Sequence, residues 1–155
     1  MNILLKIKMA FIYLWGWITG KGKAAPNLFR KGVSATDVRQ CLKKCWDLEP
    51  QLSDSAYLLS NHAGTKYMVT QCANDNSPYV DEVHDCDDFA DYMKGHISND
   101  YGYNSCLRAT GKNQSGQAHA FNIMLCWHDG KIVPHIVEPQ TGEIDVDFIV
   151  SGIRG

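Results

Sequence analysis

Residues 118–128 alternate between apolar and polar side chains, and a second run, 131–139, follows shortly after them. Such alternation is typical of β-strands. The Asp129-Gly130 dipeptide between the two runs is a strong signal for a two-residue hairpin turn. We therefore predict an antiparallel hairpin in which His128 lies opposite Lys131.

The register of this hairpin decides which side chains share a face. His119 and Glu138 become diagonal neighbours on one face, whereas His135 lies opposite Met124 on the other face. Pro134 offers an alternative, because a bulge there would shift the register by one residue and separate His119 from Glu138. We take the simple register as the prediction.

A helix is predicted between Ser34 and Trp46. Ser34 with Asp37 resembles a capping box, which is a signal for the start of a helix. The apolar face of this helix consists of Val38, Cys41, Leu42 and Cys45.

A second helix is predicted from Cys86 to about Gly95, because Phe89 and Met93 recur at helical spacing. Asp85 is a suitable N-cap residue. Unpaired backbone N–H groups at the start of a helix favour a thiolate over a thiol, so Cys86 is a candidate reactive cysteine. The alternative is that Cys86 is a small buried apolar residue beside a helix cap.

Shorter patterns occupy the rest of the chain. Apolar runs at 56–59 and 66–71 predict two short strands around a turn at 61–64. Residues 95–117 are rich in Gly, Asn and Ser, which predicts a long and partly irregular surface segment.

The composition is that of an ordinary globular domain. The chain has 155 residues, of which 45% are hydrophobic and 21% charged, enough for one domain with its own core. Its six cysteines include no Cys-x-x-Cys pair, and only scattered histidines could complete a set of zinc ligands. We therefore expect free thiols in a reducing compartment and no structural zinc site.

The N-terminal segment differs from the rest of the chain in charge. Residues 1–50 carry nine Lys and Arg against three Asp and Glu, whereas residues 51–155 carry six against fourteen. An apolar run at 9–19 favours a helix packed on the domain, or on a membrane or assembly through residues 1–23, over an export signal or anchor. We expect an apolar and basic segment with a linker at 1–32 and a globular domain at 33–155.

Location and partners follow from the same pattern. A cytoplasmic location is favoured, with export or membrane association through the N-terminal segment as the alternatives. We expect no nucleic-acid partner, because the sequence lacks the aromatic and basic pattern of an RNA-binding sheet.

Cys86, His119 and Glu138 form a candidate catalytic set. A thiol attacks a carbonyl as the thiolate, so it needs a base, and the base needs a third group to orient its ring. The three residues supply these groups in chain order. His119 could instead be a satisfied core histidine and Glu138 an exposed strand end. Their shared face favours the catalytic interpretation.

Three short blocks resemble known proteins. They are Cys86-Asp87-Asp88-Phe89-Ala90, His119-Ala120-Phe121-Asn122 and Val137-Glu138-Pro139-Gln140. In this order they resemble the papain-like protease domain of the Marasmius oreades agglutinin and its relatives. The block around Cys86 is also similar to bacterial transglutaminase-like cysteine proteinases.

The resemblance spans roughly residues 80–142 and implies an α+β fold of the papain-like or transglutaminase-like type. The nucleophilic cysteine would lie at a helix N-terminus, packed on an antiparallel sheet that carries the histidine and the glutamate. It implies Cys86 as nucleophile, His119 as base and Glu138 as orienting acid, within a papain-like cysteine hydrolase domain at 33–155.

Acidic residues crowd the candidate nucleophile. Uncompensated carboxylates raise the pKa of a thiol, so we expect a positive group nearby, either His119 as imidazolium or a divalent cation. Oxygen-rich clusters suit calcium, and calcium dependence is also implied by both resemblances. Solvated carboxylates at a helix start are the alternative. The expected calcium ligands are Asp87 and Asp88, followed by Asp85 and Asp91.

The sequence thus predicts a cysteine peptidase or isopeptidase that acts on a peptide or protein through a thioacyl-enzyme, without an organic cofactor. The enzymatic alternatives are a peptidoglycan endopeptidase or amidase, with His135 available as third residue, and a transglutaminase or deamidase. The non-enzymatic alternative is a binding or structural protein on a papain-like scaffold. Open candidates for the oxyanion-hole donor are Gln71, Asn74, Asn76, Asn104 and Gln117.

Overall fold

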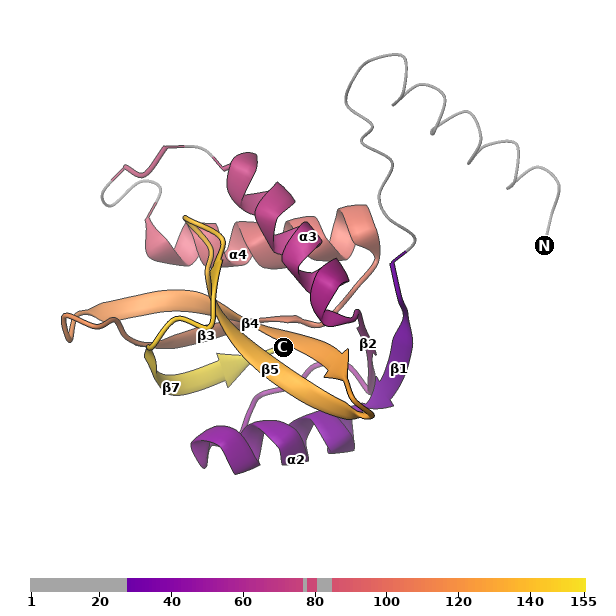
Figure 1. The fold of residues 1–155 in the computed structure, drawn as a ribbon. Helices are drawn as coiled ribbons and strands as arrows, with labels where there is room; N and C mark the ends of the chain where they lie inside the picture. The colour runs from indigo at the N-terminus through magenta and orange to yellow at the C-terminus, as the bar shows by residue number, and fades with distance from the viewer. Residues whose placement is uncertain (1–27, 77, 81–84) are drawn as a thin grey trace, which may run out of the picture.

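The computed structural model describes residues 28–76, 78–80 and 85–155 (Figure 1). The helices of this part are α2 (Ala35–Trp46), α3 (His62–Asn74) and α4 (Cys86–His96), and a π-helical turn, η1 (Ile97–Tyr101), follows α4. The strands are β1 (Lys31–Ser34), β2 (Ala56–Leu59), β3 (Cys106–Lys112), β4 (Ala118–His128), β5 (Lys131–Glu138), β6 (Glu143–Ile144) and β7 (Ile149–Arg154).

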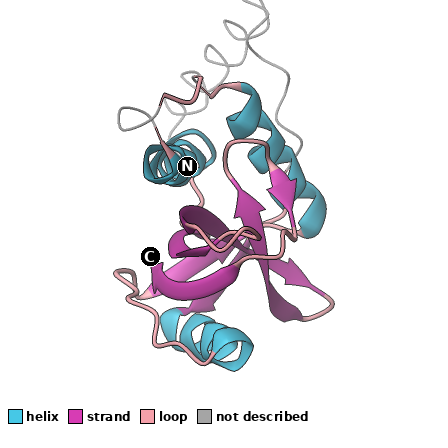
Figure 2. Cartoon of the chain, turned by 90° about the vertical axis from the view of Figure 1, so that its left-hand side faces the viewer, coloured by secondary structure: helices cyan, strands magenta, loops and turns pink. Residues whose placement is uncertain are grey.

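Five strands form one antiparallel sheet in the order β6–β5–β4–β3–β7, and β1 pairs separately with β2. Helices α3 and α4 cover one face of the sheet, and α2 covers the other (Figures 1 and 2). The sheet separates two buried clusters, one around Phe121 and Leu42 of α2, the other around Met124 with Met68 of α3 and Met93 of α4. The fold is α+β, as predicted.

The predicted hairpin is confirmed. Strand β4 pairs with β5 in the expected register, beginning with His128 opposite Lys131. The turn residues Asp129 and Gly130 have φ values of 48° and 79°, as a type I′ turn requires. The register runs through Pro134 without a shift, so the bulge alternative is wrong.

The capping box predicted at Ser34 and Asp37 is present, and α2 runs to Trp46 as predicted. Leu42 is fully buried, but Cys45 is exposed. Cys45 was therefore wrongly assigned to the apolar face, because Trp46 is the residue of the last turn that packs against the core.

The strand predicted at 66–71 is wrong, because these residues belong to α3. The side chain of Asn61 accepts a hydrogen bond from the backbone N–H of Gly64 at 2.9 Å and so caps the helix. The predicted turn at 61–64 is thus the helix start. The apolar residues of the segment are buried against the sheet as the helical set Met68, Val69 and Cys72.

The segment at 95–117 is more regular than predicted. Helix α4 ends at His96, next to the predicted end at Gly95, and the π-helical turn η1 follows it up to Gly102, which has a φ of 73°. Strand β3 then pairs on both edges, with β4 and with β7. Any side chain at Gly111 would collide with the backbone carbonyl of Ile149, so this glycine permits close strand contact rather than marking a loop.

The predicted N-terminal segment at 1–32 lies almost entirely outside the described residues, as does the expected membrane or assembly contact through 1–23. Lys31 and Gly32, assigned to the linker, are the first residues of β1. Within the described part, none of the helices is long and apolar enough to cross a membrane. All six cysteines are described and are free, as predicted.

Candidate active site

His119 and Glu138 form a hydrogen-bonded pair on one face of the hairpin. Nε2 of His119 lies 2.7 Å from Oε2 of Glu138, and each side chain is 12% exposed. The contact follows from the register, because continuing it past Asn122 and Val137 makes Glu138 a diagonal neighbour of His119.

The second oxygen of Glu138 is also held, because the backbone N–H of Gln140 donates to Oε1 at 3.1 Å. A carboxylate fixed at both oxygens favours the imidazole tautomer with its proton on Nε2. Nδ1 of His119 is then the proton acceptor, and no described residue forms a hydrogen bond to it. The pair therefore has the orientation that a general base requires.

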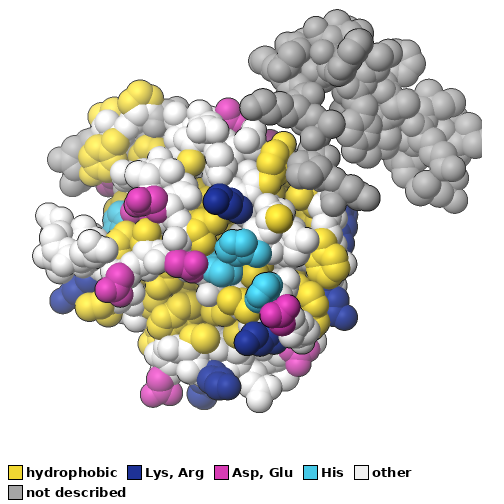
Figure 3. Space-filling model, in the orientation of Figure 1, with side chains coloured by type: hydrophobic (Ala, Val, Ile, Leu, Met, Phe, Trp, Pro, Cys, Tyr) yellow, Lys and Arg dark blue, Asp and Glu magenta, His cyan; other side chains and the backbone are white. Residues whose placement is uncertain are grey.

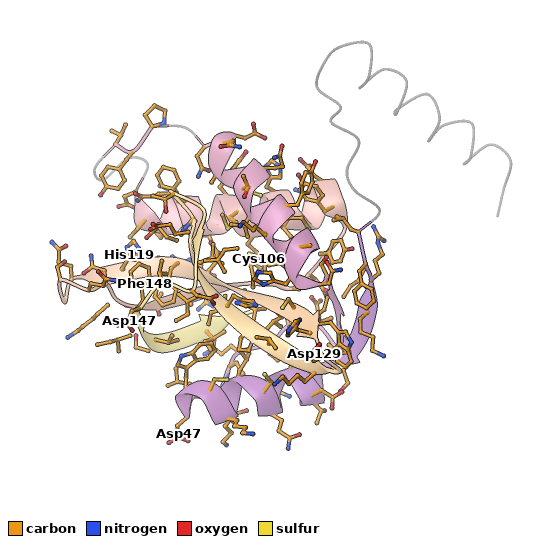
Figure 4. The ribbon with its side chains drawn as sticks, in the orientation of Figure 1. Asp47, Cys106, His119, Asp129, Asp147 and Phe148 are labelled. Carbon is orange, nitrogen blue, oxygen red and sulfur yellow. The ribbon has the colours of Figure 1, made fainter. Side chains whose placement is uncertain are left out.

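Two aromatic rings contact the imidazole of His119. Phe148 meets it edge to face, with 5.1 Å between ring centroids, and Phe121 stacks at 6.2 Å. Figure 4 shows His119 and Phe148 together at one end of the sheet. A hollow of about 440 Å³ opens beside the pair. Its other lining residues are Asn113, Gln114, Ser115 and Gln140.

Cys86 is the first residue of α4, and its side chain is half-buried. Asp85 caps the helix through a capping box, as the sequence suggested for this N-cap. The side-chain amide of Asn122 donates to the backbone carbonyl of Ala90 at 2.9 Å, which fixes the first half of α4 on β4.

Cys86 and His119 lie toward the same end of β4. Beyond Ala90, helix α4 runs along β4 so that Met93 packs in one cluster with Met124. Cys86 precedes Ala90 by one turn and therefore lies in the opposite direction, toward the start of β4, where His119 is found.

The structure does not bring the thiol of Cys86 into contact with the imidazole. Asn122 points toward α4, whereas His119 lies on the other face with Phe121. In the described part of the chain, no hydrogen bond joins Cys86 to His119 or Glu138. To form a hydrogen bond, Sγ of Cys86 would have to reach Nδ1 of His119 past the end of β4. Hydrogen bonds between catalytic groups are often long in substrate-free enzymes.

The aspartates at the start of α4 have partners of their own. Asp85 and Asp88 form the capping box. Arg108 of β3 forms ion pairs with Asp87 at 3.4 Å and with Asp91 at 3.2 Å. The contact with Asp91 is electrostatic, because Nε of Arg108 lacks the alignment of a hydrogen bond. This positive group was not predicted, because β3 lies in the segment that was predicted to be irregular.

Asp85 and Asp87 are close enough to perturb each other. Contact with Asp87 raises the pKa of Asp85, whereas the hydrogen bond with Asp85 and the charge of Arg108 lower the pKa of Asp87. The two carboxylates and the thiol of Cys86 have ligand atoms within 4.8 Å of one another. A cation relieves the repulsion between such carboxylates, so Asp85 and Asp87 fit a calcium ion better than do the other predicted ligands.

Two candidate oxyanion-hole donors have structural roles instead. The side chain of Asn104 binds the backbone of β2, and Gln117 closes a turn with Asn113. Asn76 donates to the backbone carbonyl of Pro139 at 2.7 Å. This bond ties the loop after α3 to the end of β5, beside the predicted acid.

A second group of side chains was not predicted. His62 of α3, Cys126 of β4 and His135 of β5 have ligand atoms within 4.8 Å of one another. Figure 3 shows histidine side chains gathered near the centre of one face. In the sequence the histidines are scattered. His62 comes close to the hairpin only through helix α3, and this segment was predicted as a turn followed by a strand.

Comparison with known proteins gives matches in fold alone. No protein-family model and no curated protein matches the chain. PSL1a, a Polyporus squamosus lectin solved in complex with E64, matches with a TM-score of 0.65 and 24% identity over 80% of this chain and 51% of its own. Polyporus squamosus lectin bound to the human-type influenza-binding epitope Neu5Aca2-6Galb1-4GlcNAc matches with a TM-score of 0.66 and 20% identity, over 80% and 49%.

The chain shares its fold with this lectin. It spans about half the length of the two matched chains. The resemblance to the Marasmius oreades agglutinin type, which rested on three short sequence blocks, is thus confirmed at the level of the fold.

Proposed function

We propose that this chain is a cysteine hydrolase of the papain-like class, with Cys86 as nucleophile, His119 as general base and Glu138 as the acid that orients the imidazole. The observation that carries the proposal is the 2.7 Å hydrogen bond between His119 and Glu138, at the end of β4 toward which the N-terminus of α4 lies. Further support comes from the fold shared with PSL1a, whose structure contains the peptide-like inhibitor E64.

The proposed reaction passes through a thioacyl-enzyme. Nδ1 of His119 takes the proton of Cys86, and the thiolate adds to the substrate carbonyl. The tetrahedral intermediate expels the amine, which leaves with the proton returned by the imidazolium. Water, deprotonated by the same nitrogen, then releases the acid and restores the thiol. Glu138 stabilises the imidazolium that forms in each half of the cycle.

Charged groups surround Cys86 at the start of α4. Asp85 and Asp87 carry negative charge beside the thiol, and Arg108 offsets part of this charge through its ion pair with Asp87.

We propose further that calcium binds at this acidic turn. Asp85 and Asp87 would be its first ligands, and Asp88 and Asp91 the other two. The role of the ion would be to offset the remaining negative charge near Cys86.

A peptide or protein is the proposed substrate, in keeping with the peptide-like inhibitor bound by PSL1a. A transglutaminase would pass the same thioacyl group to an amine, and a deamidase would act on glutamine with water. A peptidoglycan hydrolase with His135 as third residue has less support, because His135 lies opposite Met124, on the face away from His119. The remaining alternative is a non-enzymatic papain-like scaffold.

Labelling of the full chain with E64 or iodoacetamide, followed by peptide mass spectrometry, tests the nucleophile. We expect selective modification of Cys86 that is faster with calcium, is absent in Cys86→Ala and is strongly slowed in His119→Ala. Cys45→Ala is the matched control, because Cys45 is an exposed thiol on α2. Equal labelling of Cys45 and Cys86, indifferent to His119→Ala, would favour the non-enzymatic scaffold.

A second measurement separates the enzymatic alternatives. The purified chain is incubated with a peptide library, with muropeptides, and with a glutamine peptide plus an amine. We expect cleavage of peptides that depends on Cys86. Cleavage of muropeptides alone, or incorporation of the amine without cleavage, would replace the peptidase by the corresponding alternative.

A further inference from the structure

The hairpin face opposite His119 carries a thiol and two imidazoles that converge from three elements. Cys126 of β4 is fully buried, and His135 of β5 is 8% exposed. His62, the first residue of α3, is exposed and completes the group. Such a set combines one soft and two borderline ligands, which suits a transition metal.

The spacing of the ligand atoms fits a tetrahedral ion. Bonds of about 2.3 Å to sulfur and about 2.0 Å to nitrogen place these two atoms roughly 3.6 Å apart around zinc. Sγ of Cys126 and Nε2 of His135 are 3.2 Å apart, so a small outward movement of either side chain admits the ion. The ring of His62 lies beside that of His135, with 5.2 Å between centroids.

Asp145 provides an independent observation. Its Oδ1 lies 2.7 Å from Nδ1 of His135. The proton of the ring is thereby held on Nδ1, and the lone pair of Nε2 is directed toward Cys126. A carboxylate on the far nitrogen of a ligating histidine is the usual outer partner in metal sites.

The same residues do not suit a second nucleophile. Cys126, His135 and Asp145 stand in the order of thiol, base and acid. However, the thiol is fully buried, and burial together with Asp145 raises its pKa to about 11. A carbonyl substrate cannot approach such a sulfur, whereas a bound metal ion deprotonates a coordinating thiol outright.

We propose that His62, Cys126 and His135 bind a divalent transition metal of the zinc type, with Asp145 as the outer carboxylate that orients His135. Three protein ligands leave one coordination position for water or for a group of another molecule. Binding releases the thiol proton of Cys126 to solvent. The ion joins the start of α3 to the hairpin and so stabilises the packing of α3 on the sheet. The expectation of a chain without a zinc site is thereby revised.

Titration of the chelator-treated full chain with Co²⁺ tests the site. We expect one equivalent to bind, with a thiolate charge-transfer band and the absorption of tetrahedral cobalt, and both are displaced by Zn²⁺. Cys126→Ser removes the charge-transfer band. Asp145→Asn weakens binding about 10–100-fold, the usual effect of losing an outer partner. His62→Asn weakens binding at least tenfold, and it alters an exposed residue, so the core stays intact.

Two control variants separate this site from its surroundings. Cys86→Ala removes the thiol of the other potential ligand group, at Asp85 and Asp87. His128→Asn removes an exposed histidine of the same hairpin. Both should keep one equivalent of cobalt and its spectrum. The proposal is overturned if the wild-type chain binds no cobalt, if the bands persist in Cys126→Ser and His62→Asn, or if they vanish in Cys86→Ala.

Discussion

The β4–β5 hairpin presents one histidine–carboxylate pair on each of its faces, and the two pairs have the same length. His119 to Glu138 and His135 to Asp145 both measure 2.7 Å. Their acids differ, because the side chain of Glu138 is 12% exposed and that of Asp145 is 63% exposed. The ring nitrogen that does not contact the acid also differs: it is Nδ1 in His119, to which no described residue forms a hydrogen bond, and Nε2 in His135.

The neighbours of the free nitrogen give each pair its chemistry. The ring of His119 contacts both Phe121 and Phe148 and lies beside an open hollow, which suits a base that acts on a bound substrate. Nε2 of His135 already faces the thiol of Cys126, and a second imidazole lies beside it. In our two proposals, a histidine with a carboxylate partner therefore serves proton transfer on one face and metal binding on the other.

Loss of His119 should have the largest effect on activity. A positioned general base contributes typically 10²–10⁴-fold to the rate, so His119→Ala should lower kcat/KM by about that factor. His128→Ala is the control, because His128 is an exposed histidine at the other end of β4. Full activity of His119→Ala in a peptide-cleavage assay would remove the catalytic half of the comparison.

Replacing each acid by its amide compares the two histidine–carboxylate pairs directly. Glu138→Gln should lower kcat by about 10²-fold, because a neutral amide does not stabilise the imidazolium. Asp145→Asn should change kcat far less and should weaken cobalt binding instead. Kinetics and cobalt titration of both variants give the answer. Equal effects of the two substitutions on kcat would mean that the two sites act as one.

The buried Asn122 lies between His119 and Cys126 in β4, and its side chain holds α4 on the sheet. Its amide donates to the backbone carbonyls of Ala90 and Leu107. Asn122→Leu should lower the free energy of unfolding by about 1–3 kcal/mol, because it removes these bonds from a buried site. Urea unfolding measures this loss. We also expect slower E64 labelling of Cys86 and an unchanged cobalt spectrum. Loss of the cobalt spectrum without slower E64 labelling would show that Asn122 supports the metal site rather than the position of α4.

Alkaline pH should weaken the metal-free fold gradually. Burial raises the pKa of Cys72 to about 12 and that of Cys126 to about 11, from an ordinary value of 9.0. Between pH 9 and these values the unfolded chain loses thiol protons that the folded chain keeps, so the free energy of unfolding falls as the pH rises. Urea unfolding from pH 7 to 10 measures the slope.

Zinc should reduce this pH dependence. A metal-bound Cys126 is already a thiolate in the folded chain, so it no longer holds a proton that the unfolded chain loses. The remaining slope should come from the other buried thiols, such as Cys72, and should fall further in Cys72→Ala. A slope that is the same with and without zinc, and in Cys126→Ala, would show that Cys126 contributes nothing to it.

Local signals were sufficient for much of the candidate catalytic site. The N-cap at Asp85 and the Asp129-Gly130 turn both depend on neighbouring residues, and both were predicted. Because the turn sets the register, it also predicted that His119 and Glu138 would be neighbours. Their catalytic roles, and calcium binding at Asp85 to Asp91, stay predictions.

The errors concern segments whose state depends on distant contacts. Residues 66–71 have a strand-like pattern, but the cap at Asn61 and burial against the sheet make them helical. Strand β3 has a composition typical of loops and is ordered by pairing with β4 and β7. The first error concealed His62, which completes the proposed metal-binding cluster. The second concealed Arg108, which offsets part of the negative charge at the start of α4.

By itself the sequence determined the hairpin, its register, the capping box at Ser34, the N-cap at Asp85 and the pairing of His119 with Glu138. Each of these depends on hydrogen bonds between residues close in the chain or related by one tight turn. The tertiary structure alone decided that His62 meets Cys126 and His135, that Arg108 meets the aspartates, and on which side of β4 the helix with Cys86 lies. These contacts join elements far apart in sequence. They arise from burial of both sheet faces, which no local pattern encodes.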